Sequence, residues 1–231
     1  MLGHRNIWLG AATALLLALT ATPAAAGQPD RARCIAELGQ AGEVGGDVNV
    51  KTANFVTGTE GHDVFDEDLT PGIDVICGFG GTDIITDLGG DDIFLGGDGR
   101  DLIYWQQWGG AFHGGPGSDF VRQLMGGTFY GGEGDDYVDL YQSGGTFYGG
   151  SGDDSVYEYY KGLIVVGLSS GGTFYGEEGN DFVSRLLPAG TFYGGDGEDV
   201  VDWLCGGIFH GGPGIDSFNR VCEDEGTFNQ D

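Results

Sequence analysis

The sequence predicts an all-β solenoid in which short strands stack as successive coils. Two repeated features predict this fold. The tripeptide Thr-Phe-Tyr followed by glycine recurs with its first residue at Thr128, Thr146, Thr173 and Thr191. Each copy leads into a loop that reads GGxGxDxV with small departures. A unit of this size cannot bury its apolar face alone, so it must stack against neighbouring copies.

The spacing of the loop aspartates gives the period of the coils. Asp74, Asp83, Asp92 and Asp101 follow one another at intervals of nine residues. The later loop aspartates follow at intervals of 18, 17, 18, 27, 18 and 17 residues. We interpret nine residues as one unit and eighteen as one full coil. Each GGxGxD segment is predicted to form a turn and the next three residues a strand, whose middle side chain points inward because side chains alternate across a strand.

The inward positions predict a core of two facing apolar ladders. One ladder takes the residue two places after each aspartate: Ile76, Ile85, Phe94, Ile103, Val121, Val138, Val156, Val183 and Val201. The other takes the phenylalanine of each Thr-Phe-Tyr segment or its equivalent: Phe112, Phe129, Phe147, Phe174, Phe192 and Phe209. A third row is expected to fill the edge without aspartates: Leu124, Tyr141, Tyr159, Leu186, Leu204 and Val221.

Charge excludes several classes of partner. The chain has 36 acidic and 9 basic residues, for a formal net charge of −27. Such a surface repels nucleic acid and anionic membranes and favours cations. We expect no enzyme, because the repeats leave no room for a separate catalytic domain. His62, His113 and His210 stand at repeat positions where other copies carry ordinary residues.

The N-terminus has the pattern of a signal peptide over residues 1–26. Arg5 precedes an apolar run from Ile7 to Leu19, and Ala24-Ala25-Ala26 suits cleavage before Gly27. The run is shorter than the 20 or so residues that a spanning helix needs, and no membrane span is expected elsewhere. We therefore expect a secreted, extracellular protein with an N-terminal cap segment over 27–55 and the solenoid over 56–231.

The loops resemble the hemolysin-type calcium-binding nonapeptide repeats of the RTX family, whose consensus is GGxGxDxUx with U a large aliphatic residue. The segment from Gly96 to Ile103 matches this pattern completely, and in-register copies run from about Val56 to the C-terminus. The resemblance implies a right-handed parallel β-roll that binds Ca²⁺ between successive coils. The chain is more similar to exported repeat proteins of actinobacteria than to a toxin.

The chemistry of such a loop suits calcium. Ca²⁺ takes about six to eight oxygen ligands at roughly 2.3–2.6 Å. Glycines let the backbone aim carbonyl oxygens at one point, and strands about 4.8 Å apart bring aspartates of adjacent coils together. The candidate ligands are Asp74, Asp83, Asp92, Asp101, Asp119, Asp136, Asp154, Asp181, Asp199 and Asp216.

These aspartates predict calcium sites mainly along one edge of the roll. On the main edge, each candidate from Asp83 to Asp216, apart from Asp92, pairs with the next candidate one coil further on. On the opposite edge, Asp74 pairs with Asp92. Up to about eight Ca²⁺ ions are expected if each pair holds one. Two loops depart from the pattern: Glu177 replaces a glycine in one, and the loop that ends at Asp74 retains only Gly72.

The four cysteines predict two disulfides. Cys205 and Cys222 follow Asp199 and Asp216 by six residues each, so they occupy the same place on adjacent coils. Their expected Cα separation of roughly 5 Å lies within disulfide range. This leaves Cys34 to pair with Cys77, tying the segment before the repeats to the first coil. The alternative is four free buried thiols, which an oxidising compartment disfavours.

Two further features bear on partners. An outward row contains Tyr130, Tyr148, Tyr175 and Tyr193, flanked by His113 and His210, beside a row of threonines at 128, 146, 173 and 191. These rows either stabilise the sheet through cross-strand pairs or bind a cell-wall glycan or other polysaccharide, a partner protein or ice. Residues 161–169 interrupt the period and are expected to protrude, either folding over the roll or contacting a partner.

Overall fold

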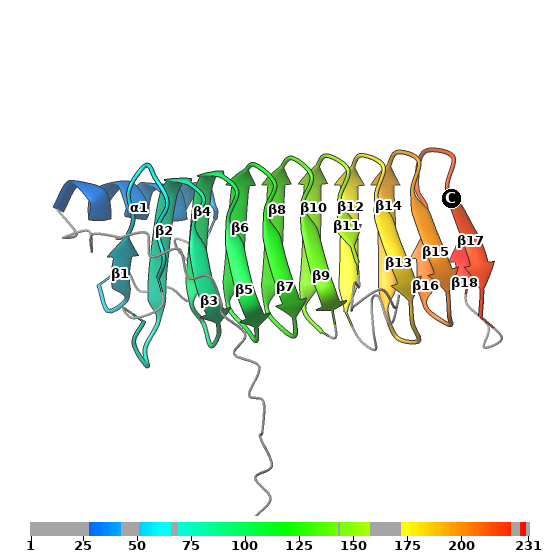
Figure 1. Cartoon of the computed structure of the whole chain (residues 1–231), viewed down its shortest axis with the longest axis horizontal. Helices are drawn as coiled ribbons and strands as arrows, with labels where there is room; N and C mark the ends of the chain where they lie inside the picture. Colours follow the sequence, from blue (N-terminus) through cyan, green and yellow to red (C-terminus); the bar gives the residue numbers. More distant parts are fainter. Residues whose placement is uncertain are drawn as a thin grey trace, which may run out of the picture.

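The computed structural model describes residues 28–42, 51–65, 69–142, 144–157, 172–222 and 227–229. Within these ranges the chain forms a helix, α1 (Gln28–Gln40), followed by short strands that stack along one long axis (Figure 1). The predicted signal peptide and the insertion at 161–169 lie outside the described residues.

The strands form two parallel sheets. The ten-stranded sheet, here called the phenylalanine sheet, contains β1 (Asn54–Thr57), β2 (Asp74–Gly81), β4 (Ile93–Gly99), β6 (Ala111–Pro116), β8 (Thr128–Glu133), β10 (Thr146–Ser151), β12 (Thr173–Glu178), β14 (Thr191–Asp196), β16 (Ile208–His210) and β18 (Thr227–Asn229). The eight-stranded sheet, here called the valine sheet, contains β3 (Ile84–Leu88), β5 (Leu102–Gln107), β7 (Phe120–Leu124), β9 (Tyr137–Gln142), β11 (Ser155–Val156), β13 (Phe182–Leu186), β15 (Val200–Leu204) and β17 (Ser217–Val221).

The chain winds between these sheets as a solenoid. From β2 onward, successive strands alternate between the two sheets, and each pairs in parallel with the strand one coil away. The arrows of the two sheets point in opposite directions in Figure 1, as a coil requires. Thr146 pairs with Thr173, so the register resumes unchanged after the insertion. The predicted all-β roll of parallel strands is therefore confirmed.

The core contains two facing ladders, as predicted. Ile76 and Phe94, which the sequence placed in the aliphatic ladder, belong instead to the phenylalanine sheet, where Ile76 pairs with Phe94 and Phe94 with Phe112, because successive nine-residue units alternate between the two sheets. The phenylalanine sheet contributes a fully buried column of rings whose neighbouring centroids are 4.6–5.0 Å apart: Phe94, Phe112, Phe129, Phe147, Phe174, Phe192 and Phe209. The valine sheet contributes a fully buried column opposite: Ile85, Ile103, Val121, Val138, Val156, Val183 and Val201. Each coil thus buries one aromatic and one aliphatic side chain, and the aromatic pairs add about 0.5–1.5 kcal/mol each beyond burial.

The turns are shorter than the predicted six residues. The strands of the phenylalanine sheet continue through the first three loop positions, as in β8, which ends at Glu133. Gly132 has φ of 120° and still pairs with Gly150. A positive φ at this position bends the strand without ending the ladder, because glycine lacks the Cβ that would clash.

The predicted edge row is correct only in part. Leu124, Leu186 and Leu204 are buried, as expected. Tyr141 pairs instead with Gln123, because the register of β7 and β9 shifts beyond Val121. Val221 is 51% exposed, since β17 is the last described strand of the valine sheet and has a neighbour on one side only. Tyr159 lies outside the described residues.

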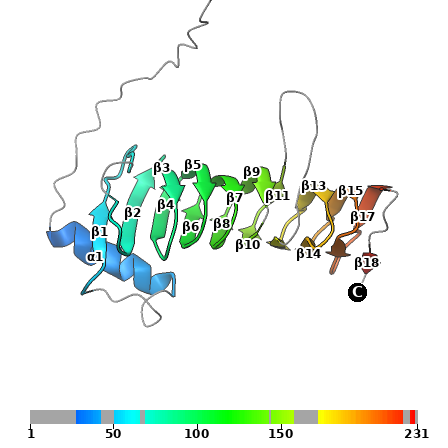
Figure 2. The same cartoon turned by 90° about the horizontal axis from the view of Figure 1, so that it is seen from below.

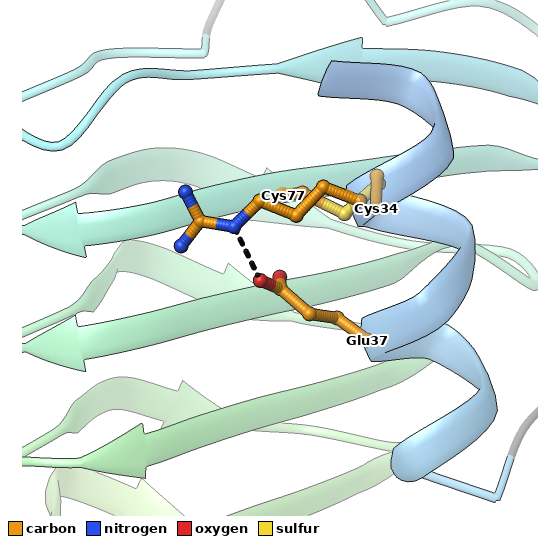
Figure 3. The surroundings of a disulfide bond; sticks show 4 residues. Cys34, Glu37 and Cys77 are labelled. Atoms are coloured by element: carbon orange, nitrogen blue, oxygen red, sulfur yellow. Dashed lines mark hydrogen bonds and ion pairs between the residues drawn. A yellow bond between two sulfur atoms is a disulfide. The ribbon is translucent and has the colours of Figure 1, made fainter. Parts of the chain in front are cut away.

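Helix α1, which the sequence patterns did not predict, covers the outward face of the first strands of the phenylalanine sheet (Figure 2). Cys34 and Leu38 are fully buried in a cluster with Val75, Cys77 and Ile93. Figure 3 shows the predicted disulfide between Cys34 and Cys77, with a Cα separation of 5.8 Å. The helix is therefore bound to the roll both covalently and by apolar packing. No helix in the described part of the chain is long and apolar enough to cross a membrane.

The second predicted disulfide also forms. Cys205 and Cys222 have a Cα separation of 4.7 Å and lie immediately after the paired strands β15 and β17. The bond joins equivalent positions on adjacent coils, as the register predicted.

The outward face of the phenylalanine sheet changes composition where α1 ends. Val75 and Ile93 pair in the row that continues to Ala111 and then to Thr128. The neighbouring row changes from cysteine and leucine to histidine and then tyrosine. Apolar side chains thus occur where the helix covers the sheet, and hydroxyl-bearing side chains occur beyond it.

Phe147→Ala is expected to lower the free energy of unfolding of the calcium-saturated protein by about 3–5 kcal/mol. The side chain is fully buried between two neighbouring rings, so its removal leaves a cavity. Urea denaturation followed by circular dichroism measures the change. Thr146→Ala, at a half-buried outward position of the same strand, is the control and should cost less than about 1 kcal/mol. Equal losses for the two variants would contradict the inward ladder.

Candidate metal centre

A continuous ladder of buried aspartates follows one edge of the roll, where the phenylalanine sheet turns into the valine sheet. Its members are Asp63, Asp83, Asp101, Asp119, Asp136, Asp154, Asp181, Asp199 and Asp216. The backbone N–H of each donates to Oδ1 of the aspartate one coil further on, at 2.6–3.0 Å. The structure therefore brings together all seven aspartate pairs predicted on this edge.

The second carboxylate oxygen of the ladder is left without a donor. From Asp83 to Asp216, Oδ2 of every ladder aspartate is buried and accepts no hydrogen bond from the described residues. A buried polar atom in this position is unfavourable unless a partner satisfies it. The same unpartnered atom recurs in eight loops, so it is a regular feature of the fold that fits a cation rather than a local packing defect.

Each Oδ2 can occupy its position only because the first loop residue is glycine. A Cβ built on Gly131 would lie 2.1 Å from Oδ2 of Asp136 and 2.6 Å from the carbonyl oxygen of Gly149. The same convergence of a carboxylate and a carbonyl from the next coil recurs beside Gly78, Gly114, Gly149, Gly176 and Gly194. These oxygens suit Ca²⁺, which accepts mixed carboxylate and carbonyl ligands.

Most ligands for such an ion would have to come from the main chain. In the described ranges, no three or more histidine, cysteine, aspartate or glutamate side chains cluster closely enough to hold a metal. The loop carbonyls and one or two carboxylates are therefore the available donor set. An oxygen-only set of this kind favours a hard cation over a transition metal.

Burial raises the pKa of seven ladder carboxyls, from Asp83 to Asp199, towards neutral pH or above it. Desolvation is the main cause, and neighbouring carboxylates add to it at several positions, while the backbone N–H donors oppose it. The pKa rises to about 8 at Asp83, about 7 at Asp101, about 9 at Asp119, about 7 at Asp136, about 8 at Asp154, about 7 at Asp181 and about 6 at Asp199.

The replacement of the second loop glycine by Glu177 leaves the site geometry intact. Glu177 has φ of 80° and Phe79, at the equivalent position of an earlier loop, has φ of 78°, both in the region usually reserved for glycine. Oδ2 of Asp181 and of Asp83 remains buried and unpartnered in these loops. The backbone conformation is therefore kept despite the larger side chain.

The pair on the opposite edge has a different donor set. The N–H of Asp74 donates to Oδ1 of Asp92 at 2.9 Å, so the predicted pair is brought together. However, Oδ1 of Asp74 accepts from Nδ2 of Asn54 at 2.6 Å, and its Oδ2 accepts from the N–H of Thr70 at 2.7 Å. Burial raises the pKa of Asp92. Protein donors thus already satisfy Asp74, unlike the members of the main ladder.

Asp63 is a ladder residue that the sequence reasoning missed. It ends the segment Gly58-Thr59-Glu60-Gly61-His62-Asp63, which fits the loop template except for threonine in place of the second glycine. That substitution concealed the match. Its Oδ2 accepts from the N–H and the hydroxyl of Thr59, at 2.6 and 3.0 Å.

These features define a parallel β-solenoid whose glycine-rich loops carry a ladder of buried carboxylates. The family model of the RTX calcium-binding nonapeptide repeat matches the chain in four copies, over residues 77–104, 128–141 and 145–157. The chain therefore contains RTX calcium-binding repeats, as the loop pattern predicted. No curated protein and no solved structure matches the chain.

The raised pKa values predict that the metal-free protein is more stable at pH 5 than at pH 8. The folded state binds protons more tightly than the unfolded chain, whose aspartates titrate near pH 4. The stability that these carboxyls contribute is therefore fully present below about pH 4. It is lost as the pH rises towards about 9, the highest pKa among them in the folded state. Urea denaturation of calcium-depleted protein at the two pH values measures this difference.

Saturating calcium should reverse the order, because the ion binds the deprotonated carboxylates and its affinity rises with pH. The same denaturation series with calcium present is the control. Metal-free stability that increases from pH 5 to pH 8 would contradict the burial of uncompensated carboxyls.

Proposed function

We propose that this chain is an exported calcium-binding β-roll that folds when Ca²⁺ occupies its loops and serves as a structural or binding module. The main support for this proposal is the row of buried, unpartnered Oδ2 atoms beside carbonyl oxygens of the next coil. Each such ligand set combines two coils, so it exists only when the coils are stacked. Calcium binding free energy is then folding free energy.

The proposed ligands are the predicted loop aspartates together with loop carbonyl oxygens. The main edge carries the stronger candidates, from Asp83 to Asp216, since their Oδ2 atoms accept no hydrogen bond within the described ranges. Binding rather than catalysis is supported because this role accounts for the paired carboxylates.

Export is supported by two observations. The apolar N-terminal segment ends in Ala24-Ala25-Ala26, a pattern typical of signal peptide cleavage. The two disulfides suit an oxidising extracellular compartment, in which calcium is also abundant.

Asp154→Asn is expected to lower the calcium stoichiometry by up to about two ions, because each carboxylate lies between two coils. Asp154 is fully buried with an unpartnered Oδ2. Titration calorimetry gives the stoichiometry, and circular dichroism gives the calcium concentration at which the β-signal appears, which should increase in the variant.

Asp153→Asn is the matched control at the adjacent position. Asp153 is exposed, and its Oδ1 accepts from the N–H of Asn180, so it is not a member of the buried ladder. The control should retain the wild-type stoichiometry. Equal behaviour of the two variants, or a β-signal that chelator leaves unchanged, would contradict calcium-linked folding through the ladder.

A second role is favoured by the outward rings of the phenylalanine sheet. His113, Tyr130, Tyr148, Tyr175, Tyr193 and His210 form one stack with centroids 4.5–5.2 Å apart and interplanar angles of 4–11°. Neighbouring rings cover each other's faces, so the row offers mainly ring edges beside the threonine row. We propose that this regular hydroxyl-bearing surface binds a hydroxyl-rich polysaccharide such as a cell-wall glycan.

Replacing Tyr148 and Tyr175 together by serine should abolish glycan retention on a glycan array or in a cell-wall pull-down while leaving calcium stoichiometry unchanged. The pair Tyr148→Phe and Tyr175→Phe, which keeps the stack and removes the hydroxyls, distinguishes edge hydrogen bonding from a purely structural stack. Retention that survives both double variants would contradict a glycan role for this face. Binding to a protein or to ice instead would identify the other partners considered for it.

A further inference from the structure

Two loops at the start of the roll, one on the main edge and one on the opposite edge, have threonine at the second loop position. In the later loops of the main edge this position has a residue with positive φ. The threonine is Thr59 in loop 58–63 and Thr70 in loop 69–74. The N–H of each threonine donates to Oδ2 of the loop aspartate, at 2.6 Å for Asp63 and 2.7 Å for Asp74. Each hydroxyl contacts the same carboxylate, at 3.0 Å and 3.1–3.2 Å respectively.

The threonine hydroxyls also close their own loops. Oγ1 of Thr59 accepts from the N–H of Gly61 at 3.1 Å, and Oγ1 of Thr70 accepts from the N–H of Gly72 at 3.2 Å. Each hydroxyl therefore both donates to the aspartate and accepts from the loop backbone. In both loops, donors from within the chain therefore satisfy Oδ2 of the aspartate.

The backbone of these loops differs from that of the others. In the later loops of the ladder the second residue has φ between 78° and 120°, whether it is glycine, Phe79 or Glu177. Neither Thr59 nor Thr70 is among the described residues with positive φ. The different turn directs an N–H and a hydroxyl at the oxygen that has no donor in the later loops.

The same region is held by contacts that need no cation. The Cys34–Cys77 disulfide and the apolar cluster of α1 attach the helix to β2. Arg33 of the helix forms an ion pair with Glu60 in the first threonine loop and lies 4.1 Å from the ring centroid of Phe79. Helix, first strands and threonine loops thus form one continuous unit.

We infer that Thr59 and Thr70 make their loops independent of calcium, and that this N-terminal unit is a preformed template on which the calcium-dependent coils stack. The inference rests on the proposed function, since it assigns which loops escape that requirement. Stacked repeats gain stability mainly from their neighbours, so one metal-free folded coil removes the nucleation cost for the next. Calcium then adds coils in order from the N-terminal end.

Hydrogen–deuterium exchange of the full chain, with calcium and with chelator, tests this order. Peptides that cover β1, β2 and the threonine loops should keep their protection in chelator. Peptides that cover β8, β10, β13 and β15 should exchange about tenfold faster or more, because their coils open. Loss of protection in all coils together would overturn the template, whereas retention in all coils would overturn the proposed calcium-linked folding and with it the contrast inferred here.

Thr59→Gly provides a second test, because it restores the two consecutive glycines of the calcium-binding loops. The variant should bind about one Ca²⁺ more than wild type in titration calorimetry, and its first loop should become sensitive to chelator. Thr59→Ser keeps the hydroxyl and is the matched control, with wild-type stoichiometry and protection. A glycine variant that binds no additional calcium and stays protected in chelator overturns the assignment of Thr59.

Discussion

The structure depends on one unfavourable arrangement, a row of carboxylates buried one coil apart. Oδ1 of each ladder aspartate accepts the N–H of the aspartate one coil earlier, so it helps to hold adjacent coils in register. Oδ2 lies beside the first loop glycine, where no Cβ would fit, and accepts no hydrogen bond from the described part of the chain. The glycine at the first loop position, the raised carboxyl pKa values and the suitability of the loops for a cation all follow from this geometry. Without a counter-charge the stacked state must neutralise these groups or lose stability.

The first loops of the roll and the later loops differ in how their aspartates are compensated. Near the N-terminus, threonine donors satisfy the loop aspartates, and α1 covers the outward sheet face with its disulfide and apolar contacts. Further along, the loops leave their carboxylates open for a metal and the outward face carries hydroxyl-bearing side chains. Charge compensation and surface composition therefore change over the same part of the chain. The result is a solenoid whose first loops supply protein donors to Oδ2 of their aspartates and whose later loops do not.

Much of this arrangement could be predicted because a stacked repeat converts linear spacing into spatial proximity. The burial of Phe147 and Val138 follows from strand alternation, and the Cys205–Cys222 bond follows from equal offsets after two loop aspartates. The predictions failed where the local pattern changed. Asp63 was missed because Thr59 stands in place of a glycine. Tyr141 was aligned with Leu124 instead of Gln123 because the register shift between β7 and β9 cannot be seen in a count of residues.

Periodicity was therefore sufficient to establish the class of fold, the inward-facing residues of the core and the pairing of most loop aspartates, although it assigned Ile76 and Phe94 to the wrong sheet. These properties repeat with every coil, so many weak copies of one signal reinforce each other. The packing of α1 depends instead on segments that are far apart in the chain, and its apolar partners are recognisable only once β2 and β4 lie side by side. The same holds for charge compensation. Whether Oδ2 of a loop aspartate has a threonine donor or no donor among the described residues is set by backbone φ and three-dimensional contact, which the spacing of residues does not encode.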